Sequence, residues 1–317
     1  MQRTLLFIVA FALAAAAHAQ TWPAKPVKIV IPFAPGGPAD IMARLEGQKL
    51  SESLGQQFIV ESRAGAGGNI GAAAVAKSPP DGYTILLTTS ALAVNVTLTP
   101  NAGYDAERDL IPVVVIAKQA NLVFAHPSVK ATTLAELLAF AKGGKLAFAS
   151  PGSGTTPHLT AENLFNVISK LDMPAVHFRG AGPSAAAVVG GEPLIGAGAI
   201  STPLPFVKSG KLRAIAVSSA SRVAALPEVP TFAESGFPGV EDETWIALFL
   251  PAGTPPEIVQ KLNAAVNQSL QAADLKERLA ALAFEPVGGT PQQFAAYLKS
   301  EIAKWGKVVR EGNIKSE

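Results

Sequence analysis

The feature that most restricts the fold of this chain is a regular alternation of strand and helix patterns that begins at Val27. Apolar runs typical of buried strands lie at 27–31, 57–61 and 83–88, with helical patterns between them at 39–54 and 69–76. Such an alternation predicts βαβ units, in which a parallel sheet is covered by helices on both faces. We therefore expect an α/β protein built on mainly parallel sheets.

The alternation starts again further along the chain. Strand patterns at 110–117 and 122–125 are separated by a short polar turn, which we expect to cross between two lobes. Further strands are predicted at 146–149, 176–178, 194–199 and 214–218, and helices at 134–141, 157–169, 183–189 and 203–208. The Pro- and Gly-rich stretch 226–239 is predicted to be a surface loop with a short helix around 232–235.

The last part of the chain is predicted to be almost wholly helical after one strand at 245–250. Its helical patterns lie at 255–273, 275–283 and 291–309. A helical tail that follows a second βα block most simply returns to the first lobe. We therefore predict lobe one at 22–121 plus 246–317 and lobe two at 122–245, with a hinge where the chain crosses.

Residues 1–19 are predicted to be a cleavable signal peptide. Arg3 supplies a positive start, 5–17 is apolar, and Ala17-His18-Ala19 matches a small-residue cleavage site. The apolar run is too short to span a bilayer comfortably, and no later run approaches the required length. Because no cysteine is available to carry a lipid anchor, we expect a free protein in the periplasm.

Composition and missing motifs restrict the chemistry further. The chain has no cysteine, and its formal net charge of +2 argues against a nucleic-acid partner, which would need a basic face. Ser153 lacks the flanking glycines of a G-x-S-x-G motif, and no P-loop, G-x-G-x-x-G or H-E-x-x-H pattern is present. We therefore predict no catalytic residue, no cofactor and no metal site.

An anion-binding turn is predicted where the first strand meets the first helix. The strand runs into Pro32-Phe33-Ala34-Pro35-Gly36-Gly37-Pro38, and Pro38 suits the first helical position. The unpaired N–H groups of a helix start favour an anion, and Gly36 and Gly37 let a ligand approach the backbone closely. Because glycine is common in such turns for steric reasons, this turn alone leaves a purely structural role equally open.

A second turn of the same design lies more than a hundred residues later. Ser150-Pro151-Gly152-Ser153-Gly154-Thr155 precedes a helix that has Pro157 near its start and Thr156 as the expected N-cap. Two such turns predict two lobes that grip one ligand. His158 could donate a hydrogen bond to that ligand, although a bond within its own loop is the simpler explanation.

Other candidates stand at the ends of predicted strands. Arg179 and Gly180 follow the strand at 176–178, at the end where parallel sheets present ligands. An arginine there could clamp a carboxylate or pair with an acidic neighbour. Ser90 follows the third strand and offers a hydroxyl. Asp40 and Arg44 are four residues apart and are expected to pair along their helix, where Asp40 could also cap the helix start.

Several separate motifs run through the chain in order. They are 32–37 with Asp40, Ala43 and Arg44, then 60–71, 80–84, 150–158, 178–180, 210–213, 226–231, Trp245 and 251–255. With these motifs the chain resembles the Bug family of periplasmic receptors, the substrate-binding component of tripartite tricarboxylate transporters. The resemblance covers nearly all of the chain beyond the predicted signal peptide.

The resemblance implies a two-lobed periplasmic-binding-protein (Venus flytrap) architecture whose ligands are usually small carboxylates. It also implies that backbone N–H groups, hydroxyls and ordered waters grip the carboxylate at 33–38 in one lobe and 150–155 in the other. Together with the strand-end positions, the candidate ligand-binding residues are Phe33, Pro35, Gly36, Gly37, Pro38, Ser90, Ser150, Gly152, Ser153, Gly154, Thr155, His158, Arg179 and Gly180.

The chain departs from the family pattern where acidic residues often occur. Aligning the surrounding glycines places Leu194 and Gly198 at those two positions, and Gly198 cannot hold a ligand's ammonium group as an aspartate would. We therefore expect an unaminated mono- or dicarboxylate in preference to an amino acid. An aromatic acid is a further candidate, since Phe33 and Phe178 could stack on a ring.

The expected function is that of a receptor which closes on a small organic anion and delivers it to an integral-membrane transporter. The alternatives are a periplasmic sensor-input protein, or an enzyme on the same scaffold in which Ser153 or His158 would do chemistry. A receptor without a cognate transporter is a further alternative. Because the receptor must open and shut, a monomer is the simplest expectation.

Overall fold

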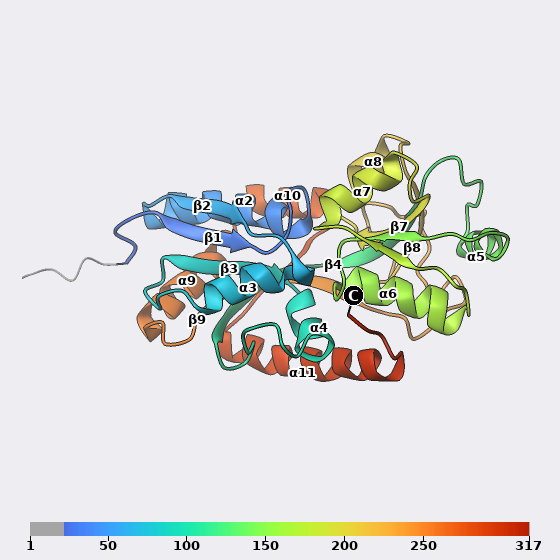
Figure 1. The fold of residues 1–317 in the computed structure, drawn as a ribbon. Coiled ribbons are helices and arrows are strands. Elements are labelled where there is room, and N and C mark those ends of the chain that lie inside the picture. The colour runs from blue at the N-terminus through green and yellow to red at the C-terminus, as the bar shows by residue number, and fades with distance from the viewer. Residues whose placement is uncertain (1–21, 317) are drawn as a thin grey trace, which may run out of the picture.

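The computed structural model describes residues 22–316, and the predicted signal peptide lies outside this range. Two α/β lobes lie side by side (Figure 1). The strands are β1 (Val27–Ile31), β2 (Phe58–Ser62), β3 (Thr84–Thr89), β4 (Leu110–Ala125), β5 (Phe148–Ser150), β6 (Ala175–His177), β7 (Ile195–Ala199), β8 (Arg213–Val217), β9 (Glu243–Pro251) and β10 (Glu285–Gly288).

The helices lie mainly on the two faces of these strands. They are α2 (Pro38–Leu54), α3 (Asn69–Ala76), α4 (Ala91–Leu98), α5 (Leu134–Lys142), α6 (Thr156–Glu162), α7 (Ala181–Val189), α8 (Leu204–Lys208), α9 (Pro256–Ser269), α10 (Ala273–Ala281) and α11 (Pro291–Glu311). Two shorter segments, the 3-10 turn η1 (Ala66–Gly68) and the π-helical η2 (Asn163–Ile168), precede α3 and continue α6. None of the described helices combines the length and apolar composition that crossing a lipid bilayer requires.

The α/β architecture expected from the alternation is present, but the strand directions are mixed rather than mainly parallel. Strands joined through crossover helices pair in parallel, namely β1 with β2 and β3, and β5 with β6 and β7. The pairs formed by β4 with β7, β8, β9 and β10, and by β9 with β3, are antiparallel.

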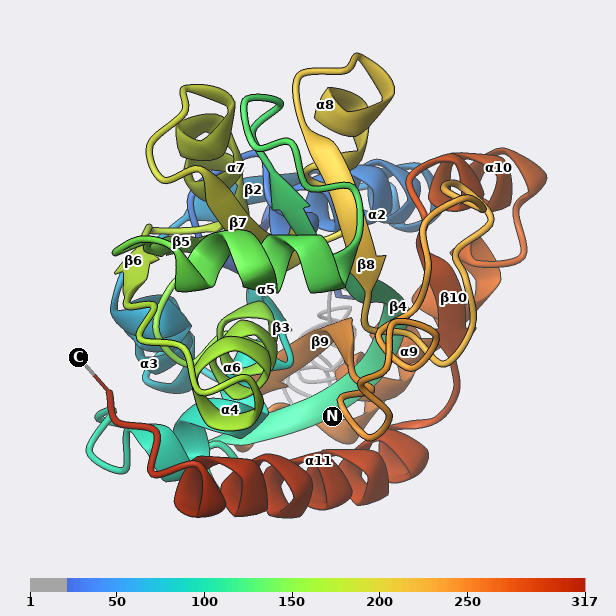
Figure 2. The same ribbon diagram turned by 90° about the vertical axis from the view of Figure 1, so that its right-hand side faces the viewer.

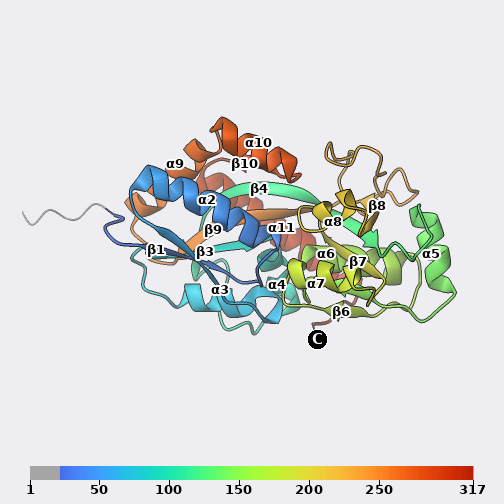
Figure 3. The same cartoon turned by 90° about the horizontal axis from the view of Figure 1, so that it is seen from above.

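The polar turn expected within 110–125 is absent, because β4 is one continuous strand that serves both lobes. Its first part pairs with β9 and its last part with β7 and β8. In Figure 3 it arches from one lobe into the other. The polar residues at the crossing have partners of their own: Lys118 pairs with Glu243, and Gln119 Oε1 accepts from Ser201 N. These polar residues therefore lie where β4 passes from one lobe to the other, and they do not form a turn.

Other differences have local causes. The sequence patterns missed α4, which is apolar on most sides and therefore lacks a helical stripe, and β10, whose side chains are mostly exposed. The helix expected around 232–235 is a turn that follows a bridge between Thr231 and Val217. The expected helix 255–273 ends at Ser269, and α10 begins at Ala273.

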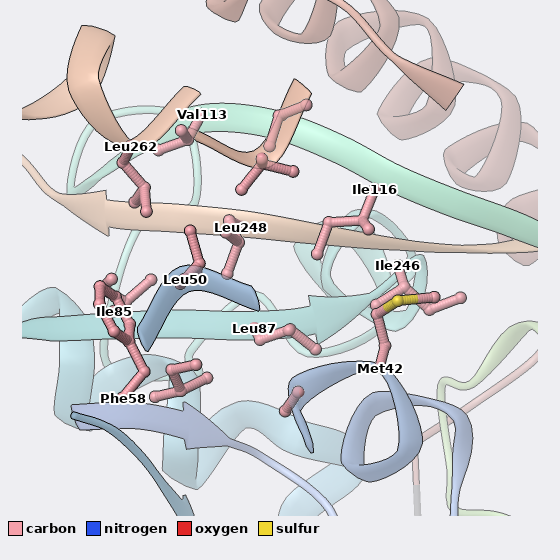
Figure 4. Close-up of a cluster of buried hydrophobic side chains, with 14 of the residues drawn as sticks. Met42, Leu50, Phe58, Ile85, Leu87, Val113, Ile116, Ile246, Leu248 and Leu262 are labelled. Atoms are coloured by element: carbon pink, nitrogen blue, oxygen red, sulfur yellow. The ribbon is translucent and has the colours of Figure 1, made fainter. Parts of the chain in front are cut away.

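Each face of each lobe has its own hydrophobic cluster, because neighbouring side chains of a strand point to opposite faces. In lobe one, Ile85 and Leu87 of β3 pack with Met42 and Leu50 of α2, as Figure 4 shows, whereas Leu86 faces the opposite cluster. That opposite cluster is covered by α4 and by α11, which runs along one edge of the molecule in Figure 2.

Candidate functional site

A small buried cavity lies between the lobes where α2, α6 and α7 begin. We call it the inner cavity, and its volume of about 30 Å³ has room for about two waters, or for a group the size of a carboxylate. Its walls are formed by Phe33, Gly37, Pro38, Ala39, Thr89, Pro151, Thr155, Pro157, Ala181, Ala199 and Thr244. None of these side chains is ionisable.

The start of α2 is held in place by its own first turn. Gly37 is the extended N-cap and Pro38 the first helical residue. The N–H of Gly36 donates to Asp40 Oδ2 (3.0 Å), and Arg44 Nε donates to Asp40 Oδ1 (3.0 Å). Asp40 therefore both supports the glycine turn and pairs along the helix. The N–H of Ala39 has no intrahelical partner because it lies in the first turn of the helix, and Ala39 is one of the residues in the cavity wall.

The start of α6 forms the facing wall, and its cap is one residue earlier than predicted. Thr155, not Thr156, has the extended N-cap conformation, and its Oγ1 donates to the carbonyl of Gly152 (2.8 Å). Gly152 and Gly154 have φ of +146° and +77°, which side chains rarely adopt. The helix continues without a break into η2, so its dipole extends over both segments.

Thr156 has a different role, because its hydroxyl belongs to a buried network between the lobes. Its Oγ1 lies 2.9 Å from Ser90 Oγ and 2.7 Å from Thr244 Oγ1. Thr244 in turn donates to Asn121 Oδ1 (2.7 Å), and Asn121 Nδ2 donates to Asp242 (3.0 Å). The cavity residue Thr244 is therefore positioned by hydrogen bonds from both lobes.

The carboxylate at the end of this network is buried. Asp242 also accepts from the hydroxyl of Thr160 on α6 and lies next to Ser218, whose Oγ donates to the Asp242 carbonyl (2.7 Å). Burial raises the pKa of Asp242, opposed by the hydrogen bonds from its neighbours. Sequence patterns missed Thr89, Thr244 and Asp242 because none lies in a glycine turn; the hydroxyl run 88–90 at a strand end was the available signal.

The two lobes also make hydrogen bonds to each other at the turn that precedes α2. The N–H of Ala34 donates to the carbonyl of Arg179 (2.8 Å), and Thr202 Oγ1 donates to the carbonyl of Gly36 (3.4 Å). Gly180, with φ of +146°, lies against Ala34: a Cβ at Gly180 would be 3.0 Å from its N. The structure therefore has both lobes in contact around the cavity.

A second space, which we call the outer cavity, adjoins the first. Its volume is about 230 Å³, and its walls are formed by Phe33, 65–68, 151–153 and 177–179. Phe33 and Pro151 belong to both cavities. The ring of Phe33 reaches the glycine turn, since a Cβ at Gly68 would lie 3.0 Å from its Cζ.

The sequence of this chain is similar to those of known receptors. The sequence model of the family described as tripartite tricarboxylate transporter family receptor matches residues 42–314. The chain belongs to this family. It is 38% identical to the protein BugT of Bordetella pertussis over 314 residues, which are 98% of this chain and 96% of BugT. The family resemblance predicted from the sequence motifs is therefore confirmed.

Solved structures of relatives share the fold of this receptor. The R. palustris protein Rpa4515, solved with adipate, has a TM-score of 0.89 and 35% identity, covering 93% of this chain and all (100%) of that one. MatC from Rhodopseudomonas palustris, solved with malate, has a TM-score of 0.87 and 33% identity, covering 91% and 100%. The predicted α/β, two-lobed fold class is confirmed by this likeness.

Some of the predicted site residues line the two cavities and the others do not. Phe33, Gly37, Pro38 and Thr155 line the inner cavity, and Phe33, Gly152, Ser153 and Arg179 line the outer one. The remaining candidates line neither cavity and are Pro35, Gly36, Ser90, Ser150, Gly154, His158 and Gly180. For all of the predicted site residues, including those that line a cavity, a part in ligand binding stays a prediction.

His158 makes the local bond that was the simpler explanation of its place in the sequence. Its Nδ1 accepts from the N–H of Gly154 (3.3 Å), and its ring packs edge-on against His177 at 4.6 Å. Burial, with a smaller effect of His177, lowers the pKa of His158 to about 3. The ring is therefore neutral at physiological pH and holds the second glycine turn.

The residues considered for catalysis are not arranged as a nucleophile and base. Ser153 Oγ is buried and has no hydrogen-bond partner among residues 22–316, so no described base reaches it. Within the same range, no group of three or more His, Asp or Glu side chains is placed to hold a metal ion.

Proposed function

We propose that this receptor closes on a small organic carboxylate in the inner cavity and delivers it to the membrane subunits of a tripartite tricarboxylate-type transporter. The observation that carries the proposal is an uncharged cavity at which three helices begin. Helix starts carry unpaired N–H groups and partial positive charge, which stabilise an anion without a lysine or arginine. The hydroxyl of Thr89 in its wall offers a further donor, whereas those of Thr155 and Thr244 already donate to Gly152 and Asn121.

The proposed ligand lacks an amino group. Neither cavity has an acidic side chain in its wall, so an ammonium group would be desolvated without a counter-charge. The expectation that a side chain at position 198 would face the ligand is not used here. A Cβ at Gly198 would lie 3.4 Å from Phe124 Cε1, in the core. The relatives solved with adipate and malate support a carboxylate. A ring would fit only the larger outer cavity, beside Phe33 and Phe178.

The cellular setting belongs to the same proposal. We propose export by a signal peptide at 1–19, action in the periplasm and a monomeric state. The family supports the periplasmic setting, and the sequence expectations motivate the other two. We also propose the lobes as 22–121 plus 246–317 and 122–245. The passage of β4 through both sheets supports a hinge near residue 121.

A thermal-shift screen of the mature chain from Gln20 onward tests the proposal. The panel holds succinate, malate, adipate and benzoate, the amino acids aspartate and glutamate, and the neutral diamide of adipate. A ligand that binds only the folded protein raises the midpoint with its concentration. We expect shifts with unaminated acids alone. Aspartate binding much more tightly than succinate would overturn the unaminated class, and no shift with any acid would overturn the receptor function.

A pair of variants on α7 provides the control. Ala181→Leu places a larger side chain in the inner cavity, whereas Ala186→Leu adds the same side chain at an exposed position of the same helix. We expect Ala181→Leu to lose the ligand-induced shift and Ala186→Leu to keep it. Equal shifts in both variants would place the ligand elsewhere.

A further inference from the structure

The buried network that includes the cavity residue Thr244 ends at a carboxylate that lines neither cavity. Its members run in the order Ser90, Thr156, Thr244, Asn121 and Asp242, and hydrogen bonds of 2.7–3.0 Å join neighbouring side chains. None of these residues is more than 7% exposed. An unpaired polar group is costly in the interior, so each proton of the network needs an acceptor.

The carboxylate determines the direction of all these hydrogen bonds. Asp242 Oδ1 accepts from Asn121 Nδ2, so the amide oxygen of Asn121 is turned toward Thr244. Thr244 gives its single proton to that oxygen. Thr156 must therefore donate to Thr244, and Ser90 must donate to Thr156. One acceptor at position 242 thus fixes the donor at every step of the network.

This direction does not depend on whether Asp242 is ionised. Its other oxygen, Oδ2, faces the hydroxyl of Thr160 on α6. A proton bound at Oδ2 would be donated to Thr160, whose own proton can turn to the carbonyl of Thr156 (2.8 Å). Oδ1 then remains an acceptor for Asn121. Asp242→Asn would keep the same direction, with the N–H groups of the new amide facing Thr160.

The network joins three elements that form the inner cavity. Ser90 directly follows the cavity residue Thr89 at the end of β3. Thr244 is itself a cavity residue on β9, and Thr156 is the first residue of α6. Thr160 ties the next turn of α6 to the same carboxylate, since residues four apart lie on one face of a helix. The start of α6 is therefore held at two points, beside a cavity of about 30 Å³ that leaves little room for a shift.

We propose that Asp242 is a positioning residue for ligand binding, which touches no ligand and acts by fixing the side-chain amide of Asn121. Through Asn121, Thr244 and Thr156 it holds the start of α6 in the position where the helix meets the ligand. This inference rests on the proposed function, because it assumes that a carboxylate binds in the inner cavity. The direction of the hydrogen bonds, and not the charge at position 242, then determines the affinity.

The test exchanges the two side chains and measures the affinities for succinate, malate and adipate by isothermal titration. Asp242→Leu removes the acceptor, and Asn121→Asp removes the donor that faces it. The double variant Asn121→Asp, Asp242→Asn restores a donor between the two positions and leaves an oxygen for Thr244. We expect each of Asp242→Leu and Asn121→Asp to weaken binding by about tenfold or more, and Asp242→Asn and the double variant to bind like the wild type. Asn101→Asp, at an exposed position that lines neither cavity, controls for the added charge.

A second pair of variants removes a hydroxyl without changing the charge. Thr156→Val interrupts the network, whereas Thr254→Val removes another buried hydroxyl, which donates to the carbonyl of Pro251 and lines neither cavity. We expect Thr156→Val to weaken binding and Thr254→Val to leave the affinity unchanged. Urea unfolding of the unliganded proteins measures their stability, so that a loss of affinity can be separated from a loss of folding.

The outcomes separate the two proposals. If the wild type binds none of the three acids, the proposed function fails and the positioning role fails with it. If an acid binds the wild type, Asn121→Asp and Thr156→Val equally well, the positioning role is wrong and the receptor stands. The role is also overturned by a folded double variant that binds no better than Asn121→Asp, or by an equal loss of affinity in Asn101→Asp. If the variants at 121 and 242 do not fold, equal affinities of Thr156→Val and Thr254→Val would overturn it.

Discussion

At the scale of single residues, Glu46 shows how burial controls a charge away from the site. This carboxyl lies between α2 and α9, where it accepts from Ser269 Oγ (2.8 Å), and burial raises its pKa from 4.5 to about 7. Its second oxygen has no hydrogen-bond partner in the described part of the chain. In the folded protein Glu46 therefore favours its neutral form.

The raised pKa of Glu46 predicts a stability that falls as pH rises. Between the unfolded value of 4.5 and the folded value of about 7, the folded state keeps a proton that the unfolded state has released. We expect Glu46→Gln to stabilise the protein by about 1–3 kcal/mol near pH 8 and to have little effect near pH 4. Urea unfolding across this range measures it, with the exposed Glu277→Gln as control. A variant no more stable than the wild type near pH 8 would contradict the prediction.

The lowered pKa of His158 has the opposite effect on the pH dependence of stability. Because its folded pKa of about 3 lies below the unfolded value of 6.5, the stability from this buried neutral ring is present above 6.5 and is lost as pH falls toward the folded pKa. Ring-proton NMR of the folded protein between about pH 7.5 and 4.5 should show no titration of His158. A titration near its ordinary pKa would mean that the second glycine turn is more open to water than the structure shows.

At the scale of elements, the lobes meet through helix starts and turns that lack side chains. Gly182 lies in the first turn of α7, and a Cβ there would overlap the carbonyl oxygen of Pro35 in the other lobe. The backbone of Gly182 is not in the left-handed region, so an alanine suits the helix itself. Only contact between the lobes requires glycine at this position.

Gly182→Ala should therefore hinder closure of the lobes without destabilising the fold. We expect an unliganded thermal midpoint equal to or above that of the wild type, together with weaker ligand binding. Overpacking costs about 1–3 kcal/mol, which corresponds to about a 5- to 150-fold loss of affinity. Titration with the acid that the screen identifies measures this loss, and Gly144→Ala, which meets nothing within 4 Å, is the control. Unchanged affinity in Gly182→Ala would show that binding does not need this contact.

At the scale of the whole molecule, β4 and β9 connect the lobes, and the network around Asp242 and Asn121 lies at their crossing. A ligand that contacts both lobes favours the state in which they touch, in proportion to its difference in affinity for the two states. The touching lobes of this structure correspond to the liganded state in our proposal.

Closure predicts a change of shape in solution. X-ray scattering should give a smaller radius of gyration with saturating ligand than without it, and Gly182→Ala should not reach the compact value. The scattering curve calculated from this structure should fit the liganded sample better than the free one. Identical curves with and without ligand would mean that binding occurs without lobe movement.

Much of the fold follows from local patterns along the chain. The strand 27–31, the helix starts at Pro38 and Pro291, and the capping box of Thr133 with Glu136 are short-range features that the residues themselves specify. The glycine turns at 36–37 and 152–154, on which the prediction of the site rests, are local features of the same kind, since they depend on backbone conformation and helix starts.

The tertiary structure alone decided which residues share the site and how the strands run. The sequence by itself determined the α/β class, the family and the two turns, because these depend on local periodicity and on motifs. The course of β4 through both lobes, the place of Thr244 in the cavity wall and the outer cavity beside Phe33 depend on contacts between residues far apart in the chain. Such contacts arise from strand pairing and lobe packing, which leave no local pattern in the sequence.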